Sequence, residues 1–173
     1  DLDCACNPAC PGLTVGLSST SVAQGESFIV NGTAREVDTV DIVVVAPEGS
    51  NGSMICPTGT PLQAGTNIYH AVVPVTAECT FTKEICVGTD VDTGNYLVVV
   101  LSKGHDGGYA QGQYNNLTEA LAKYDLTGKT QDQVLAILMG ATVDVAGSDD
   151  LMLKKYINVI SPSPQKEDCT NGV

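Results

Sequence analysis

The sequence predicts a mainly β domain: an antiparallel sandwich of short strands with a two-helix insertion before the last strand. Three observations lead to this fold class. Short apolar runs rich in β-branched residues recur between turn residues, which is typical of sandwich strands. An Asp-x-Gly-x-Tyr motif comes just before the most apolar of these runs. Two later stretches instead carry apolar residues at helical spacing.

The expected strands follow one another along the first part of the chain. Residues 13–17 alternate apolar side chains with small or polar ones, as a half-buried strand requires. A second strand is expected around Phe28 and Val30, after a turn at Gln24 and Gly25. The remaining apolar runs predict strands at 40–46, 68–75, 80–87 and 96–101, and the last of these is the strongest signal.

The motif before that last strand is the most specific feature of the sequence. Asp92, Gly94 and Tyr96 match the tyrosine corner that begins strand F of immunoglobulin-like sandwiches. In such a corner, the tyrosine hydroxyl donates a hydrogen bond to the backbone upstream and fixes the crossover between the sheets. We therefore expect an immunoglobulin-like sandwich in which Tyr96 is buried and bonded in this way.

A helical insertion is predicted at about residues 116–140. One apolar face with i, i+3, i+4, i+7 spacing is formed by Leu117, Ala120, Leu121 and Tyr124. Thr130 and Gln133 form a capping box that begins a second helix, and Gly140 is expected to end it. Both stripes are expected to face the core rather than a cofactor.

The chain is predicted to close with a long strand that has one buried face. That face consists of alternating apolar residues: Leu151, Leu153, Ile157 and Val159. Lys155 interrupts the alternation, so we expect it to lie near a sheet edge. The predicted organisation is a cysteine-rich arm at 1–11, the sandwich with its insertion at 12–160, and a tail at 161–173 that carries Cys169.

Composition and charge exclude several classes of partner. The 173 residues carry 20 acidic and 8 basic side chains, a net charge of −12, which disfavours nucleic acid and anionic lipid. No run reaches the roughly 18–20 apolar residues that a membrane helix needs, so we expect no membrane insertion. The chain begins at Asp1 without a leader, and we interpret it as a mature form whose signal peptide has been removed.

Seven cysteines indicate disulfide bonds in an oxidising, extracellular setting. They are Cys4, Cys6, Cys10, Cys56, Cys79, Cys86 and Cys169. Their spacing lacks the C-x2-C pairs of zinc sites, and neither histidine lies near a cysteine in the sequence. Cys79 and Cys86 flank a short strand and would clamp a hairpin if their Cα atoms approached each other closely enough.

An odd number of cysteines leaves at least one sulfur either free or bonded to another chain. The terminal cysteines lie outside the predicted core. A disulfide from them to a neighbouring subunit would make the assembly resistant to detergent and heat. We therefore expect at least one of Cys4, Cys6, Cys10 and Cys169 to link subunits, with one free buried thiol as the alternative. Three N-x-S/T sequons, at Asn31, Asn51 and Asn116, also favour a secreted chain and are candidate N-glycosylation sites.

No catalytic constellation is recognisable. The sequence lacks G-x-S-x-G, H-E-x-x-H and a phosphate loop, so we expect no enzyme, no catalytic residue and no cofactor. His70 lies within an apolar strand pattern and is expected to be packed or at an edge. His105 precedes Asp106 in a predicted loop, where a metal-binding or general-base role is the less common outcome.

A bound structural divalent cation remains an alternative because the chain is so acidic, but no residue set is assigned to it. Asp90 and Asp92 resemble the start of a calcium loop, yet the fifth position is Gly94 and the pattern fails. Asp149 and Asp150 are adjacent acidic residues before the last strand. They could hold a cation at the end of the sandwich, although such a pair is usually just solvated.

Four blocks in order resemble the immunoglobulin-like repeat of methanogenic archaeal S-layer and sheath proteins. They are LTVGLSSTSVAQGE at 13–26, VDIVVVAPEG at 40–49, DTGNYLVVVL at 92–101 and GSDDLM at 147–152. The resemblance implies a self-assembling structural subunit of an extracellular cell-envelope layer, a sheath rather than a flat S-layer. It implies copies of the chain as partners, through strand pairing and disulfides, and brings no catalytic residue. A single domain, no anchor and many cysteines depart from the family's usual pattern.

Two other classes of function are alternatives to a structural subunit. A secreted adhesion module that binds carbohydrate or a partner cell would display exposed aromatic side chains, for which Tyr109 and Tyr114 are the candidates. Aromatic residues make up only 5% of the chain and tryptophan is absent, which argues against that class. An extracellular hydrolase would have to depend on His105.

Overall fold

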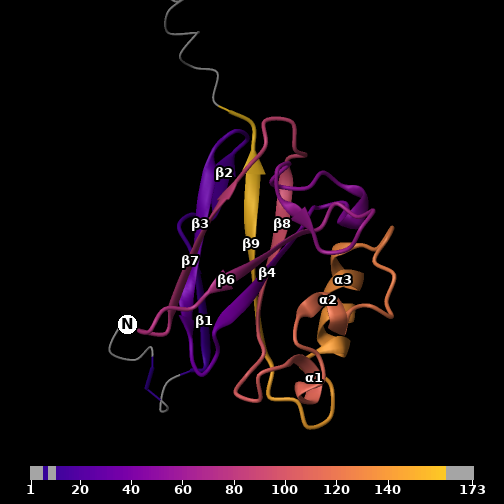
Figure 1. Cartoon of the computed structure of the whole chain (residues 1–173). Helices are drawn as coiled ribbons and strands as arrows, with labels where there is room; N and C mark the ends of the chain where they lie inside the picture. Colours follow the sequence, from indigo (N-terminus) through magenta and orange to yellow (C-terminus); the bar gives the residue numbers. More distant parts are fainter. Residues whose placement is uncertain (1–5, 8–10, 163–173) are drawn as a thin grey trace, which may run out of the picture.

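Two β-sheets and a layer of short helices make up the computed structural model, which describes residues 6–7 and 11–162 (Figure 1). The strands are β1 (Leu13–Leu17), β2 (Ser21–Ala23), β3 (Ser27–Ala34), β4 (Thr39–Val45), β5 (Thr60–Pro61), β6 (Tyr69–Pro74), β7 (Thr80–Cys86), β8 (Gly94–Ser102) and β9 (Leu151–Ile160). The helices are the 3-10 turn η2 (Gly49–Asn51) and the helices α1 (Tyr109–Gly112), α2 (Leu117–Ala120) and α3 (Gln131–Ala141). The short strands β2 and β5 were not predicted from the sequence.

The order of the strands is that of an immunoglobulin-like sandwich. The smaller sheet has the order β1-β3-β7, and the larger has the order β2-β9-β8-β4-β6-β5. Every pair is antiparallel except β2 with β9, which run parallel. This matches strands A, B and E packed on a sheet built around G, F and C, with an additional strand beside C. The predicted fold class is therefore confirmed.

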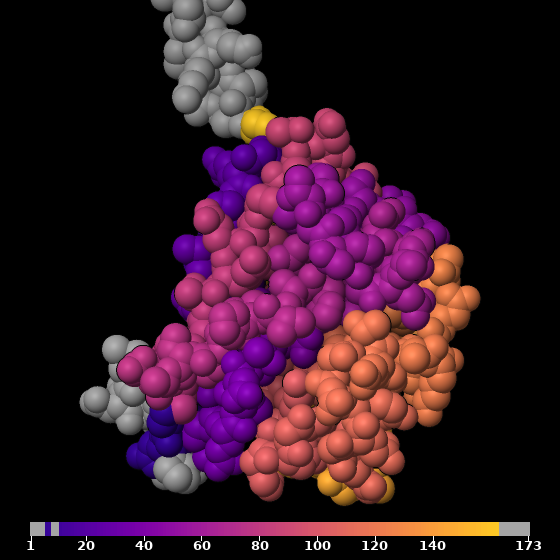
Figure 2. All heavy atoms as spheres, viewed as in Figure 1, coloured from indigo at the N-terminus to yellow at the C-terminus, as the bar shows by residue number. Residues whose placement is uncertain are grey.

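The two central strands of the larger sheet, β4 and β8, are buried on both faces. In β4 and β8, alternate side chains such as Ile42 and Val98 face the smaller sheet, while Val43 and Val99 face the helices. A strand covered on both faces needs apolar residues at successive positions, which explains the unbroken runs seen in the sequence. In the space-filling view the insertion, in orange, lies against the purple segment before β6 (Figure 2). Gln63 from that segment donates a hydrogen bond to the carbonyl of Tyr124 at 2.8 Å.

The insertion between β8 and β9 contains three short helices where two were predicted. The capping box of α3 is present, with Thr130 and Gln133 bonding reciprocally, and the helix ends at Ala141, one residue after the predicted stop. Helix α2 makes a single turn, so Tyr124 lies beyond it rather than on its face. Helix α1 contains Ala110 at φ 62°, an unusual angle for a residue with a side chain.

The closing strand β9 is buried over only part of its length, which corrects the prediction of one fully buried face. Ile157 and Val159 are buried, but Leu151 and Leu153 are about two-fifths exposed. The reason is that β2 pairs only with the last three residues of β9, so the first part of β9 forms the edge of the sheet. Lys155 lies on this edge, as its position in the sequence pattern suggested.

Candidate functional site

The Asp-x-Gly-x-Tyr motif forms a tight corner at the start of β8. The Tyr96 side chain is fully buried, and its hydroxyl donates a hydrogen bond to the carbonyl of Asp92 at 2.8 Å. Gly94 adopts φ 131°, and a Cβ there would lie 2.9 Å from Cγ of Pro47. The Asp92 carboxylate accepts hydrogen bonds from the backbone and hydroxyl of Ser53. The motif therefore joins three segments of backbone and has a structural role in this geometry.

Two disulfides join described residues, and neither pairs Cys79 with Cys86. Cys6 bonds to Cys79 with a Cα–Cα distance of 5.5 Å, and Cys56 bonds to Cys86 with 5.3 Å. The expected hairpin clamp was wrong because β7 separates Cys79 from Cys86 with extended chain, which places its ends about 20 Å apart.

The predicted set of intersubunit cysteines changes as a result. Cys6 is used within the chain, where it ties the N-terminal arm to the turn between β6 and β7. Cys4, Cys10 and Cys169 lie outside the described residues. Bonded cysteines of this kind are compatible with an extracellular protein.

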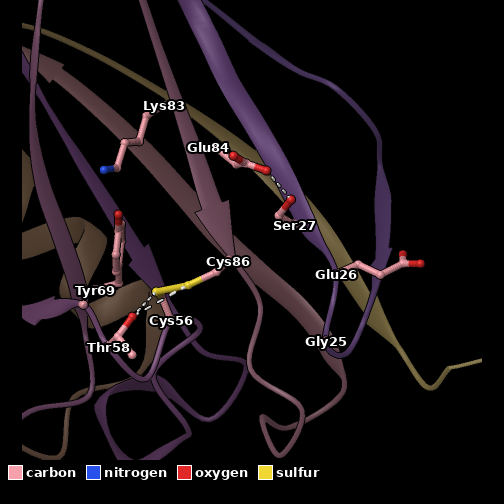
Figure 3. A pocket seen from close by; sticks show the side chains of 10 residues that line it. Gly25, Glu26, Ser27, Cys56, Thr58, Tyr69, Lys83, Glu84 and Cys86 are labelled. Carbon is pink, nitrogen blue, oxygen red and sulfur yellow. Dashed lines mark hydrogen bonds between the residues drawn. A yellow bond between two sulfur atoms is a disulfide. The ribbon is translucent and has the colours of Figure 1, made fainter.

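An open depression of about 580 Å³ lies over the Cys56–Cys86 disulfide (Figure 3). Its lining includes the buried ring of Tyr69, whose burial raises the pKa of its hydroxyl. Glu84 accepts a hydrogen bond from Ser27 at 2.6 Å, while Glu26 points away from the disulfide. The polar groups around this depression thus point in different directions instead of converging on one reacting atom.

A buried polar network fastens the helical layer to the larger sheet. Asp41 lies on β4 and is almost fully buried; its carboxylate is 2.7 Å from Nε2 of His70 and accepts a very short hydrogen bond from the hydroxyl of Tyr109. Burial, followed by the charge and hydrogen bond of Asp41, raises the pKa of Tyr109 well above its usual value. Tyr109 is therefore not a platform for sugar binding, as the adhesion hypothesis required. Asp41 was missed, although it is the only charged residue in the apolar run at 40–46.

Three aspartates meet at the end of the larger sheet, where the insertion begins and ends. Asp106, Asp149 and Asp150 each place one carboxylate oxygen within 4.8 Å of the others. Burial, together with the charges of the other two aspartates, raises the pKa of Asp150 to about 7, against the opposing effect of its hydrogen bonds. His105 lies 2.6 Å from Asp149 through Nδ1, but its ring is mostly exposed.

The three sequon asparagines are all exposed, each in a different setting. Asn31 lies on the outer face of β3, and Asn51 ends the turn η2. Asn116 caps α2 by accepting a hydrogen bond from the backbone of Glu119 at 2.8 Å through its side-chain oxygen. That bond uses the oxygen, so it leaves the side-chain nitrogen, the atom that carries an N-linked glycan, outside the cap.

The geometry defines a disulfide-bonded immunoglobulin-like sandwich with a helical layer on its larger sheet. No family model matches the chain, and no curated protein matches it either. None of the helices in the described part of the chain is long and apolar enough to cross a membrane.

Proposed function

We propose that the chain is a non-catalytic structural subunit of an extracellular cell-envelope layer, a sheath or S-layer, which assembles with copies of itself. The location of the exposed hydrophobic side chains carries this proposal. Of the six large ones exposed among the described residues, five lie on two strands near opposite edges of the larger sheet. They are Leu151, Leu153, Tyr156 and Ile160 on β9 and Val72 on β6.

Both strands also have unpaired backbone along one side. Within the part of the chain that the structure describes, residues 151–157 of β9 pair only with β8, and residues 71–74 of β6 pair only with β4. An exposed row of N–H and C=O groups is a template on which a strand from another chain can add. Strand addition at these two edges would extend the larger sheet from one subunit into the next.

Charge favours a head-to-tail contact between unlike edges. The β9 edge carries the exposed residues Lys154 and Lys155, so pairing two β9 edges would bring like charges together. Strand β6 itself contains no lysine, although Lys83 of β7 lies beside it. The chain as a whole carries a net charge of −12, which attracts the basic β9 edge. A head-to-tail contact forms rings if it closes and open filaments if it does not, and either can be an element of an envelope layer.

The cell-envelope setting is supported by the disulfides, the exposed sequons and the resemblance to archaeal sheath and S-layer repeats. We further propose that one of Cys4, Cys10 and Cys169 links neighbouring subunits covalently. Electrophoresis of native material without reductant, after thiols have been blocked, tests this part separately. Ladders that collapse on reduction are expected, and a single monomer band would contradict the covalent link.

Edge pairing is tested by placing one charge on each edge. Leu153→Glu and Val72→Glu should each prevent the purified chain from forming sheets, hoops or tubes in electron micrographs. Ile29→Glu is the matched control, because Ile29 is as exposed as Leu153, at 38% against 40%, but lies on the central strand of the smaller sheet. Its assembly should be unchanged.

Mixing the two edge variants distinguishes head-to-tail pairing from two-fold pairing. The Leu153→Glu chain keeps an intact β6 edge and the Val72→Glu chain keeps an intact β9 edge, so their mixture should form dimers and stop there. Assembly that survives both substitutions, or that Ile29→Glu blocks equally well, would refute the proposed edges.

A further inference from the structure

The end of the larger sheet brings two acidic loops together. Strands β8 and β9 are antiparallel, with Ser102 opposite Leu151 at the last pair of the ladder. The loop that leaves β8 carries Asp106, and the loop that enters β9 carries Asp149 and Asp150. The pairing of the two strands therefore places three carboxylates, far apart in sequence, within 4.8 Å of one another.

The carboxylate of Asp150 is buried, and a hydrogen bond to only one of its two oxygens is seen among the described residues. Asp150 is 6% exposed, and its Oδ2 accepts a hydrogen bond from the backbone of Ala110 at 2.7 Å. Its Oδ1 is buried and has no hydrogen-bond partner among the described residues, and the same holds for Oδ1 of Asp149. A buried carboxylate oxygen without a partner is costly, because it has lost water and gained nothing in return. Two such atoms at the point where three acidic side chains meet favour the binding of a positive ligand there.

We propose that Asp106, Asp149 and Asp150 bind a calcium ion. Calcium takes six to eight oxygen ligands in flexible geometry, so three carboxylates can be completed by backbone carbonyls and water. Magnesium demands a stricter octahedron and holds its water more firmly. Among the described residues, the only basic side chain within 4.0 Å of these carboxylates is the exposed ring of His105, which contacts Asp149.

The backbone around the cluster is shaped to bring the carboxylates close. Gly104 adopts φ 75°, and a Cβ there would lie 2.4 Å from Cγ of Asp149, so the aspartate lies directly against the loop. The hydrogen bond from the backbone of Ala110 to Asp150 fixes α1 to this end of the sheet. Ala110 is the residue of α1 with the strained backbone angle, φ 62°. An ion bound here would tie both ends of the helical insertion to the end of the sheet.

Calcium titration of the full chain after dialysis against a chelator tests the site. Calorimetry should give one site per chain, with an affinity in or tighter than the range of extracellular modules, roughly 0.1–1 mM. Calcium at a hundred times its dissociation constant should raise the melting temperature by about 5–10 °C. Magnesium at the same concentration should raise it much less.

Three aspartate-to-asparagine variants assign the ligands. Asp150→Asn keeps an acceptor for Ala110 and should weaken calcium binding at least tenfold. Asp106→Asn does the same from an exposed position, so it remains informative if the buried variant fails to fold. Asp144→Asn removes the same charge from an exposed residue outside the cluster and should leave the affinity unchanged.

The proposal is overturned if no saturable binding is seen at about 10 mM calcium, well above the affinity range of extracellular modules. Equal binding of magnesium, or equal effects of Asp106→Asn and Asp144→Asn, would overturn it too.

Discussion

Replacing both cysteines of the Cys56–Cys86 bridge by alanine should destabilise the domain by about 3–4 kcal/mol. The two cysteines are 30 residues apart in sequence, and the chain-entropy relation gives about 3.6 kcal/mol at 25 °C for a closed loop of that length. For a chain of this size, each kcal/mol lowers the melting temperature by about 2–4 °C, so a fall of about 7–14 °C is expected. The double variant is preferred because a single one leaves an unpaired thiol next to the core.

Thermal and urea unfolding of the wild type and the double variant measure this difference, without reductant so that the other disulfides stay intact. Peptide mapping under non-reducing conditions should first recover the Cys6–Cys79 and Cys56–Cys86 pairs. A loss below about 1 kcal/mol would refute the entropic reasoning, since it would mean that the bridge does not restrict the unfolded chain. A peptide joining Cys79 to Cys86 would refute the pairing itself.

Two further predictions concern the buried tyrosine corner. Tyr96→Phe should cost about 1–3 kcal/mol in denaturant unfolding, because the buried carbonyl of Asp92 loses its donor, whereas the exposed Tyr156→Phe control should cost nothing measurable. Burial, then the charges of Asp92 and Glu48, raises the pKa of Tyr96 to about 12, against about 10 when unfolded. Its stabilising contribution is therefore complete below pH 10 and lost as the pH rises towards 12, so between pH 9 and pH 11 the wild type should lose more stability than Tyr96→Phe.

Local patterns were sufficient to predict most of the strands and the corner. A run such as 40–46 has few alternatives to a buried strand, because its β-branched side chains suit a pleated surface and it is too short for a typical helix. The Asp-x-Gly-x-Tyr motif is equally local: Tyr96 bonds to a carbonyl only four residues upstream. The capping box at Thr130 and Gln133 also lies within one turn of chain. Each feature was recognisable because the residues that make it are neighbours in the sequence.

Features that depend on distant segments were missed. The partner of Cys79 is 73 residues away, and only the folded arm and turn bring the two sulfurs together. The exposure of Leu153 depends on where β2 begins alongside β9, which no pattern within β9 records. Likewise, Asp149 and Asp150 were recognised as an acidic pair, but their approach to Asp106 follows from the antiparallel pairing of β8 and β9.

If copies of the chain assemble as proposed, the helical insertion favours growth at the edges of the larger sheet over growth on its face. Without the helices, alternate apolar residues of β4 and β8, including Val43 and Val99, would face solvent as a flat hydrophobic surface. Such surfaces stack sheet on sheet, which would compete with ordered addition at the edges. The Asp41–Tyr109 bond and the bond from the backbone of Ala110 to Asp150 both anchor the insertion. Tyr109→Phe removes one anchor without removing the ring, so it should loosen the helical layer and shift assembly from ordered sheets towards irregular aggregates. Unchanged order in electron micrographs, together with unchanged hydrogen-exchange protection in α3, would show that the insertion does not need this anchor.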